Sequence, residues 1–215
     1  VEVIIVYGYK IFEELKELGL NTTYLGQKIV ENELFSGKSF VLTGTLTMYT
    51  RDEAKEKIES VLESLPLHHG ARFEKYCLSN KDESNERKEF SSLIRNELPF
   101  ETYMELAEWY EGMGCIDEAL KLLTCAGDYP LALYQSAYLI KKKGDTAQSN
   151  SALEKANSLS PDFVYPFRPK TIDYLNWAAN KSNNWKIKYY LGLTYWTNQQ
   201  KEKALNLLNS CSSAN

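Results

Sequence analysis

The sequence predicts a mainly α-helical fold: a solenoid of about three helix pairs from about Phe90 to Cys211, preceded by a small, incomplete α/β segment. Two observations lead to this prediction. Helical periodicity is nearly continuous from Phe90 onward and is interrupted only at turns that contain glycine or proline. A register of small and aromatic residues also recurs at fixed offsets in the same stretch, which is typical of helices that pack closely in pairs.

The register consists of a small residue, a large residue three positions later and a second small residue twelve positions after the first. Its two clearest copies are Ala107, Tyr110 and Ala119, and Gly192, Tyr195 and Ala204. A third copy keeps Ala137, Gly144, Leu153, Ala156 and Pro161, with Ser149 where the second alanine is expected. Small residues let two helices approach closely, so the pattern predicts a scaffold that holds partners and gives no sign of chemistry.

The first third of the chain divides into shorter segments. Residues 1–33 are predicted to form a short amphipathic helix and a linker, and residues 34–65 a buried strand at 40–46 followed by a helix. Thr50 and Glu53 have the spacing of a capping box, and Ala54, Ile58 and Val61 give the following helix an apolar face. This part therefore reads as strand, turn and helix.

Residues 66–89 are predicted to be a hinge, because the apolar pattern fades there and a mixed charge run fills residues 81–89. The helical repeats then occupy residues 90–215. The stretch 163–184 is longer than a repeat turn, carries Pro166 and Pro169, and contains a predicted helix at about 171–179. We expect this stretch to interrupt the array.

Composition excludes several classes of function. The net charge of −4 and an isoelectric point near 5.4 argue against a nucleic-acid surface, so DNA is not expected as a partner. The opening run Val3–Tyr7 is too short to span a bilayer, and neither a membrane nor an export signal is expected. The four cysteines share no C-x-x-C spacing, which predicts reduced thiols in a cytoplasmic protein without metal or cofactor.

The register described above resembles that of tetratricopeptide repeats, helix-turn-helix units of about 34 residues. The segments Arg95–Pro99, Ser160–Phe163, Pro166–Arg168 and Asn183–Tyr189 look like the repeat tails of large bacterial proteins that carry a sugar-active β-domain upstream. The first-helix tryptophan of the family is absent, and the insertion separates the second and third units. The resemblance implies an appended protein-interaction module without the sugar-active domain.

Residues 11–60 resemble a different family, the bacterial NAD-dependent DNA ligases, at the start of their BRCT domain. The segments that carry this resemblance are Phe12–Asn21, Phe35–Leu46 and Thr50–Lys55. In BRCT domains a threonine and a glycine at the end of the first strand form part of a phosphate pocket, which implies this role for Thr43 and Gly44. The remaining strands and the pocket lysine are not recognisable after Ser60, so the resemblance implies a truncated BRCT-like segment, joined to the repeats by a natural or artificial fusion. The catalytic residues of the ligases are absent, which implies that the chain does not ligate DNA.

Other short motifs favour structural roles. Gly37-Lys38-Ser39 lacks the upstream glycine of a Walker loop, and a strand rather than a helix is predicted to follow it. The neighbouring His68 and His69 have no further metal donors at a suitable spacing. Four acidic residues share one helix face and are expected to be solvated: Glu101, Glu105, Glu108 and Glu111.

The first functional hypothesis is a non-catalytic scaffold whose concave face binds a protein or peptide segment. Its candidate contacts are Tyr103, Tyr110, Tyr134, Tyr138, Tyr189 and Tyr195. The competing interpretation is that these aromatic side chains pack in the core and between repeats. The second hypothesis is a BRCT-type ligase fragment that contributes to DNA or phosphopeptide binding, and an enzyme acting on sugars is a remote third.

Overall fold

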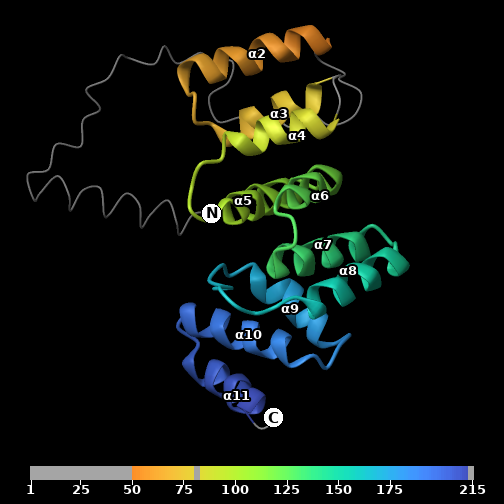
Figure 1. Ribbon diagram of the computed structural model, residues 1–215, viewed down its shortest axis with the longest axis vertical. Helices are drawn as coiled ribbons and strands as arrows, with labels where there is room; N and C mark the ends of the chain where they lie inside the picture. The colour runs from red at the N-terminus through yellow and green to blue at the C-terminus, as the bar shows by residue number, and fades with distance from the viewer. Residues whose placement is uncertain (1–49, 80–82, 213–215) are drawn as a thin grey trace, which may run out of the picture. The chain divides into compact units, whose positions relative to one another are not determined.

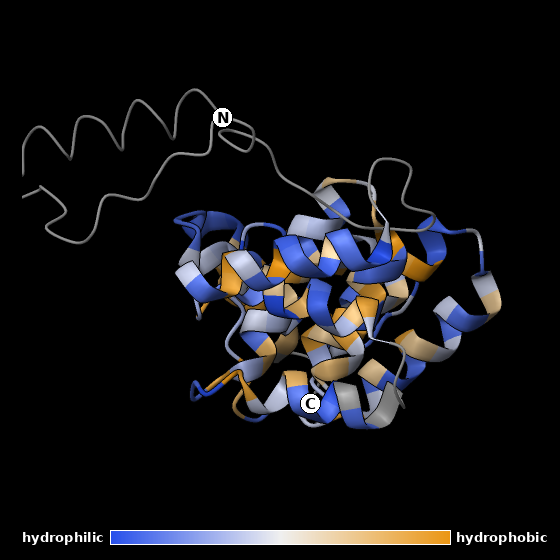
Figure 2. Cartoon of the chain, turned by 90° about the horizontal axis from the view of Figure 1, so that it is seen from above, coloured by the Kyte–Doolittle hydropathy of each residue, from blue (hydrophilic) through white to orange (hydrophobic). Residues whose placement is uncertain are grey.

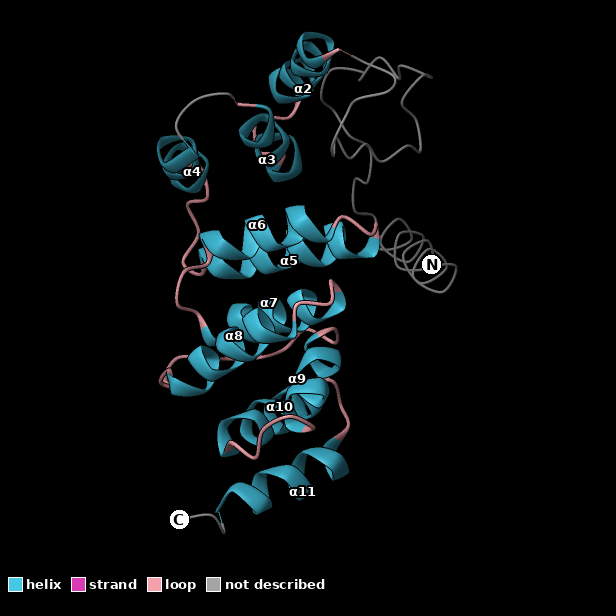
Figure 3. Cartoon of the chain, turned by 90° about the vertical axis from the view of Figure 1, so that its right-hand side faces the viewer, coloured by secondary structure: helices cyan, strands magenta, loops and turns pink. Residues whose placement is uncertain are grey.

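The computed structural model describes residues 50–79 and 83–212, and every regular element in these ranges is a helix (Figures 1 and 3). The helices are α2 (Arg51–Ser64), α3 (His69–Leu78), α4 (Glu83–Ser92), α5 (Pro99–Gly112), α6 (Ile116–Cys125), α7 (Pro130–Lys142), α8 (Thr146–Ser158), α9 (Thr171–Ala179), α10 (Trp185–Thr197) and α11 (Lys201–Ser212). The mainly α-helical prediction is therefore confirmed for these ranges. The predicted strand at 40–46, and with it the α/β half-BRCT segment, lies outside the described residues.

Helix α2 begins at the predicted capping box. The backbone N–H of Glu53 donates to Thr50 Oγ1 at 3.3 Å, and the Thr50 N–H donates to Glu53 Oε2 at 2.7 Å. Ala54 and Ile58 are buried in a small cluster with α3, whereas Val61 keeps 39% of its surface exposed. Ala54 and Ile58 therefore form the buried face of this helix, and Val61 does not belong to it as its spacing predicted.

The segment predicted as a hinge, residues 66–89, instead contains α3 and most of α4. Phe73 and Tyr76 of α3 lie in the main core, with ring centroids 5.6 and 5.7 Å from that of Phe90. The hydroxyl of Tyr110 in α5 donates to the buried Glu74 carboxylate at 2.5 Å. The hinge prediction was wrong because the charge run dominated the sequence, while the three-residue spacing of Phe73 and Tyr76 fits one helix face.

Three antiparallel helix pairs follow: α5 with α6, α7 with α8, and α10 with α11. The small residues of the recurring register lie where each pair is in contact, since Ala107, Ala119, Ala137 and Ala204 have no exposed surface. A Cβ atom added at Gly192 would approach Leu208 of α11 to 2.8 Å. The helix pairs predicted from this register are therefore present.

Ser149 is the one departure from the register, and its contacts show how it replaces the expected alanine. Its side chain is buried, and its hydroxyl donates to the backbone carbonyl of Ala137 at 2.8 Å, across the contact between α7 and α8. Serine is only slightly larger than alanine and satisfies its own donor here, so close helix packing is retained.

The turns inside the three pairs have the same geometry. Two residues after the end of the first helix, the backbone has a positive φ: 81° at Gly114, 94° at Gly144 and 62° at Gln199. Glycine adopts this conformation without steric cost, but glutamine does not. The third pair therefore carries backbone strain that the first two avoid.

The predicted insertion is present and its helix, α9, spans the expected residues Thr171–Ala179. Residues 161–170 lead into it as an extended segment, which we call the strap. Val164 and Pro166 of the strap are buried, whereas Phe163, Tyr165 and Phe167 are exposed. Helix α9 contacts both α7 and α10, so it completes the stack between the second and third pairs.

Hydrophobic and hydrophilic residues alternate in bands along the helices (Figure 2).

Candidate interaction surface

Three of the six candidate tyrosines are core residues. Tyr110 and Tyr134 have no exposed surface, and Tyr103 has 3%. The Tyr134 hydroxyl donates to Asn157 Oδ1 at 2.7 Å, and its ring lies edge-on to that of Tyr190. These side chains offer no surface to a partner, so for Tyr103, Tyr110 and Tyr134 the contact prediction is corrected in favour of packing.

The other three candidates are half-buried and lie on two different parts of the surface. The ring of Tyr138 in α7 is 5.8 Å from that of Trp177 in α9. The side-chain amide of Asn176, next to Trp177, donates weakly to the Tyr195 hydroxyl of α10 at 3.4 Å. Tyr189 instead lies beside Trp185 at the start of α10, 6.1 Å between centroids.

Tyr138, Trp177 and Tyr195 thus follow one another across α7, α9 and α10, and we call these three residues the aromatic face. Helix α9 lies between the other two helices because two of its adjacent residues contact different neighbours. Asn176 contacts α10, and Trp177 contacts α7. Each of the three rings retains accessible surface. Rigid, partly exposed aromatic side chains on helices are good anchors for a bound segment, since they lose little conformational entropy on binding.

Charged side chains border the aromatic face at Tyr138. Lys142, one turn further along α7, places its ammonium 5.2 Å from the centre of the Tyr138 ring and donates to Glu111 Oε1 at 2.8 Å. Lys170 approaches the same oxygen at 3.6 Å and also pairs with Asp173 at 3.0 Å. Glu111 is buried, so two cations from separate segments compensate one desolvated carboxylate.

Glu108 lies one turn before Glu111 on α5 and is only partly compensated. Burial raises the pKa of its carboxyl to about 7, against the opposing influence of Arg168 and Lys170. Its Oε1 atom is buried without a hydrogen-bond partner among the described residues. The prediction that the acidic row of α5 is solvated is therefore wrong for Glu108 and Glu111, and also for Glu101, whose side chain is 13% exposed.

Two further polar groups near Tyr138 are buried and lack partners within the described part of the chain. They are the indole Nε1 of Trp177 and both amide atoms of Gln135. Gln135 precedes Tyr138 by three residues, so the two side chains share a side of α7. An unpaired buried N–H costs about 1–3 kcal/mol of stability.

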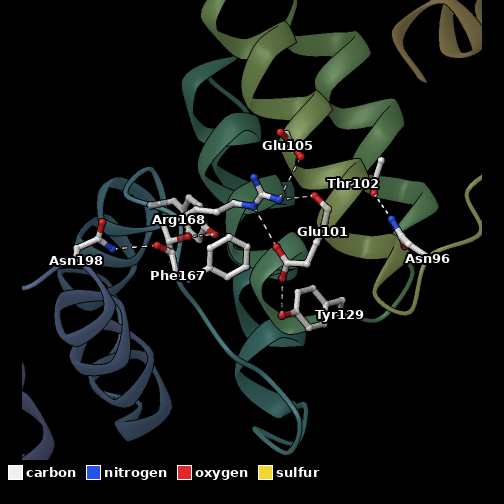
Figure 4. A network of polar contacts seen from close by, with 10 residues as sticks. Asn96, Glu101, Thr102, Glu105, Tyr129, Phe167, Arg168 and Asn198 are labelled. Atoms are coloured by element: carbon white, nitrogen blue, oxygen red, sulfur yellow. Dashed lines mark hydrogen bonds and ion pairs between the residues drawn. The ribbon is translucent and has the colours of Figure 1, made fainter. Parts of the chain in front are cut away.

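The strap that leads into α9 is bonded on two sides, to Glu101 of α5 and to Asn198 after α10 (Figure 4). Arg168 donates from Nε to Glu101 Oε2 at 3.0 Å and from a terminal nitrogen to the Glu101 carbonyl at 2.9 Å. Tyr129 donates to the other carboxylate oxygen of Glu101 at 3.1 Å. At its other side, the strap carbonyl of Phe167 accepts from the side-chain amide of Asn198, the residue after α10, at 3.0 Å.

His68, His69 and Cys77 carry reactive side chains in the described part of the chain. His68 Nδ1 accepts from the backbone N–H of Ala71 at 3.0 Å and caps α3, and burial lowers the pKa of His69. Burial also raises the pKa of the Cys77 thiol to about 12, so this thiol stays protonated at neutral pH. Within residues 50–79 and 83–212, no group of three His, Cys, Asp or Glu side chains could hold a metal ion, and no helix is long and apolar enough to cross a membrane.

Sequence reasoning missed the charged residues around the aromatic face. Arg168 and Lys170 are far from α5 in the sequence, and only their approach in three dimensions pairs them with Glu101 and Glu111. The one local signal was the absence of any basic residue in α5, which leaves its acidic row in need of distant cations. The phosphate-pocket candidates Thr43 and Gly44 lie outside the described residues.

No family model matches the chain. Its N-terminal region is similar to a short stretch of bacterial DNA ligases. The ligase of Acetivibrio thermocellus is 52% identical over 48 residues, and that of Anoxybacillus flavithermus 50% identical over 54 residues. These matches cover 22% and 24% of this chain but span only 7% and 8% of the ligases. The resemblance to DNA ligase is therefore confirmed as a local one.

Solved structures similar to this chain include proteins with helical repeats. MamA is 17% identical, with 76% of this chain and 87% of that chain covered, at a TM-score of 0.32. A putative kinesin light chain from Podosopora anserina with nearly identical TPR-like repeats is 14% identical, with 76% and 84% covered, at a TM-score of 0.29. TM-scores this low do not establish a shared fold.

Proposed function

We propose that this protein is a non-catalytic scaffold that binds a segment of another protein on its aromatic face. The observation that carries the proposal is the contact between Tyr138 and Trp177, two partly exposed rings that lie side by side on α7 and α9. Tyr195 extends the same surface onto α10. Of the six tyrosines predicted as contacts, Tyr138 and Tyr195 remain candidates on this face.

The geometry suits an extended segment or a short helix that presents apolar side chains to the rings. The surface is preformed by the ion pairs of Lys142, Lys170 and Arg168, so little of the binding free energy is lost in ordering the scaffold. The buried carboxylates Glu108 and Glu111 lie beside the same surface and favour a segment without acidic side chains at that point. A cytoplasmic location is part of this proposal and accords with the four free cysteines.

The test compares the amounts of partner proteins that the wild-type chain and its variants capture in a pull-down. The variant Tyr138→Ala/Trp177→Ala is expected to lose at least one captured partner by more than about tenfold, as is common for central aromatic anchors. Tyr165→Ala is the matched control, because Tyr165 is an exposed aromatic residue outside the aromatic face. The proposal fails if every partner of the wild-type protein is captured equally by the double variant while its helical content and thermal midpoint are unchanged.

A second candidate function is favoured by the local identity of 50–52% to DNA ligases. In this candidate, the N-terminal region is a truncated BRCT-type fragment that binds DNA or a phosphorylated peptide, with Thr43 and Gly44 in the phosphate pocket. Fluorescence anisotropy of a labelled nicked duplex at low salt tests the DNA branch, with binding expected to vanish in Lys38→Glu/Arg51→Glu. A phosphoserine peptide and its unphosphorylated form test the other branch in the same assay.

A further inference from the structure

The last helix pair carries an excess of positive charge that the rest of the chain does not share. Residues 181–212 contain five lysines and one glutamate, a net charge of +4, whereas the whole chain has −4. The lysines are Lys181, Lys186, Lys188, Lys201 and Lys203. None of them takes part in an ion pair among the described residues.

Two of these lysines, Lys186 and Lys203, make contacts within the fold, and Lys203 donates to Gln200 Oε1 at 2.9 Å. Lys186 donates from Nζ to the backbone carbonyls of Asn157, at 3.0 Å, and Leu159, at the end of α8. Lys203 lies over the ring of Tyr195 at 5.3 Å, and Lys181 and Lys201 are exposed. The remaining cationic charge therefore faces solvent without a carboxylate to balance it.

Large apolar side chains are exposed beside these lysines. Trp185 and Trp196 on α10 keep 45% and 47% of their surface, and Leu205 on α11 keeps 48%. Tyr189 and Leu193, both half-buried, lie between the two tryptophans in sequence. Their spacing of four, four and three residues places these four side chains on one side of α10, as a ridge about 16 Å long.

We propose that this surface binds an acidic segment of another protein in which carboxylates alternate with bulky apolar side chains. We call the surface the lysine–tryptophan face and define it as Trp185, Lys188, Trp196, Lys201 and Lys203. The apolar side chains of the segment would cover the tryptophans, and its carboxylates would pair with Lys188, Lys201 and Lys203. The inference rests on the proposed scaffold role, because its occupant is a protein, but it concerns a separate set of residues that borders the aromatic face where Lys203 lies over Tyr195.

Charge complementarity selects this occupant over nucleic acid. Residues 50–180 contain 16 basic and 22 acidic side chains, a net charge of −6 that repels a long polyphosphate. A short acidic segment confined to the last helix pair avoids that repulsion. The lysine–tryptophan face also contains no arginine, the residue most suited to bidentate phosphate recognition.

The test is fluorescence anisotropy of the full chain with a labelled 12-residue peptide in which pairs of glutamates alternate with leucine and phenylalanine. We expect saturable binding at 50 mM NaCl that weakens severalfold at 500 mM, where exposed charges are screened. Trp196→Ala and Trp185→Ala are each expected to weaken binding about tenfold. Lys188→Glu/Lys203→Glu is expected to weaken it about tenfold or more, whereas Lys141→Glu, an exposed lysine on α7, changes it less than about twofold.

Three results would overturn the inference and leave the scaffold proposal to its own test. They are no saturable binding of the acidic peptide, equal binding of a peptide with lysines in place of the glutamates, or preferential binding of single-stranded oligothymidine. A loss of peptide binding in Tyr138→Ala/Trp177→Ala, with Trp196→Ala unaffected, would also overturn it and would support the aromatic face instead. Circular dichroism of each variant verifies that the fold is intact.

Discussion

The first two helix pairs and the third pair use the same residue types in opposite ways. Around α5 and α7, lysine and arginine side chains meet carboxylates from distant segments, as Arg168 does with Glu101 and Lys142 with Glu111. On α10 and α11 the lysines have no such partners among the described residues, and tryptophans beside them are exposed. The difference teaches that a cation is held in the fold where another segment supplies an acceptor, a carboxylate or, for Lys186, backbone carbonyls, and otherwise remains free for a partner.

Removing Arg168 is expected to give the largest effect in this comparison. Arg168→Ala leaves the Glu101 carboxylate, whose side chain is 13% exposed, without its cation, and should lower the free energy of unfolding by about 2–4 kcal/mol. Urea denaturation measures this loss. Lys203→Ala, from the unpaired set, is the control and should change stability by less than about 0.5 kcal/mol. Equal effects of the two substitutions would erase the distinction between the pairs.

Lys142 provides a smaller effect of the same kind. Lys142→Ala leaves Glu111 with Lys170 alone, at 3.6 Å, and should cost about 1–2 kcal/mol in unfolding free energy. Its neighbour Lys141 is exposed and absent from the ion pairs of the described residues, so Lys141→Ala should be nearly neutral. If thermal unfolding showed no difference between the two variants, the contact to Glu111 would have no energetic role.

Glu108 sharpens the comparison, because it is a group in the well-paired region that is not fully compensated. Burial raises its pKa to about 7 from the usual 4.5, so the folded chain retains a proton that the unfolded chain releases between these values. Its stabilising contribution is complete below pH 4.5 and is lost as the pH rises through 7.

Glu108→Gln should therefore match the wild type near pH 5 and exceed its stability by about 1–2 kcal/mol at pH 8.5. Urea denaturation at the two pH values measures this difference. Glu97→Gln, at an exposed position, should leave the pH dependence unchanged. A parallel pH dependence of Glu108→Gln and the wild type would show that the carboxyl titrates normally.

The smallest expected effect is in the turn of the third pair. Gln199→Gly removes the steric cost of φ 62° and should stabilise the protein by about 0.5–1 kcal/mol, with a small rise in the thermal midpoint. Gln200→Gly, at the next position, relieves no such strain and should be neutral or destabilising. A loss of stability in Gln199→Gly would mean that the turn geometry is not strained in solution.

Local signals predicted much of this fold. The capping box at Thr50, the helix Thr171–Ala179 and the three pairs all follow from periodicity, turn residues and spacing within a few turns of chain. Such features depend on neighbours in the sequence, so they can be derived without knowing the packing.

The features that sequence reasoning missed depend on which helix lies against which. Tyr110 could have faced a partner, but α3 packs on it and buries its hydroxyl against Glu74. Tyr134 is enclosed in the same way by Asn157 of α8 and Tyr190 of α10. Of the candidate surface, the sequence indicated Tyr138 and Tyr195, whereas the cations beside them come from segments whose approach no local pattern predicts.

The strap gives this array a property that simple repeats lack. Helical repeats are usually coupled only to their nearest neighbours, so they can melt progressively from one end. Here the strap joins Glu101 of α5 to Asn198 after α10, two elements that the second pair separates along the chain. Opening either end therefore strains the other, and the three pairs are expected to unfold in a single cooperative transition.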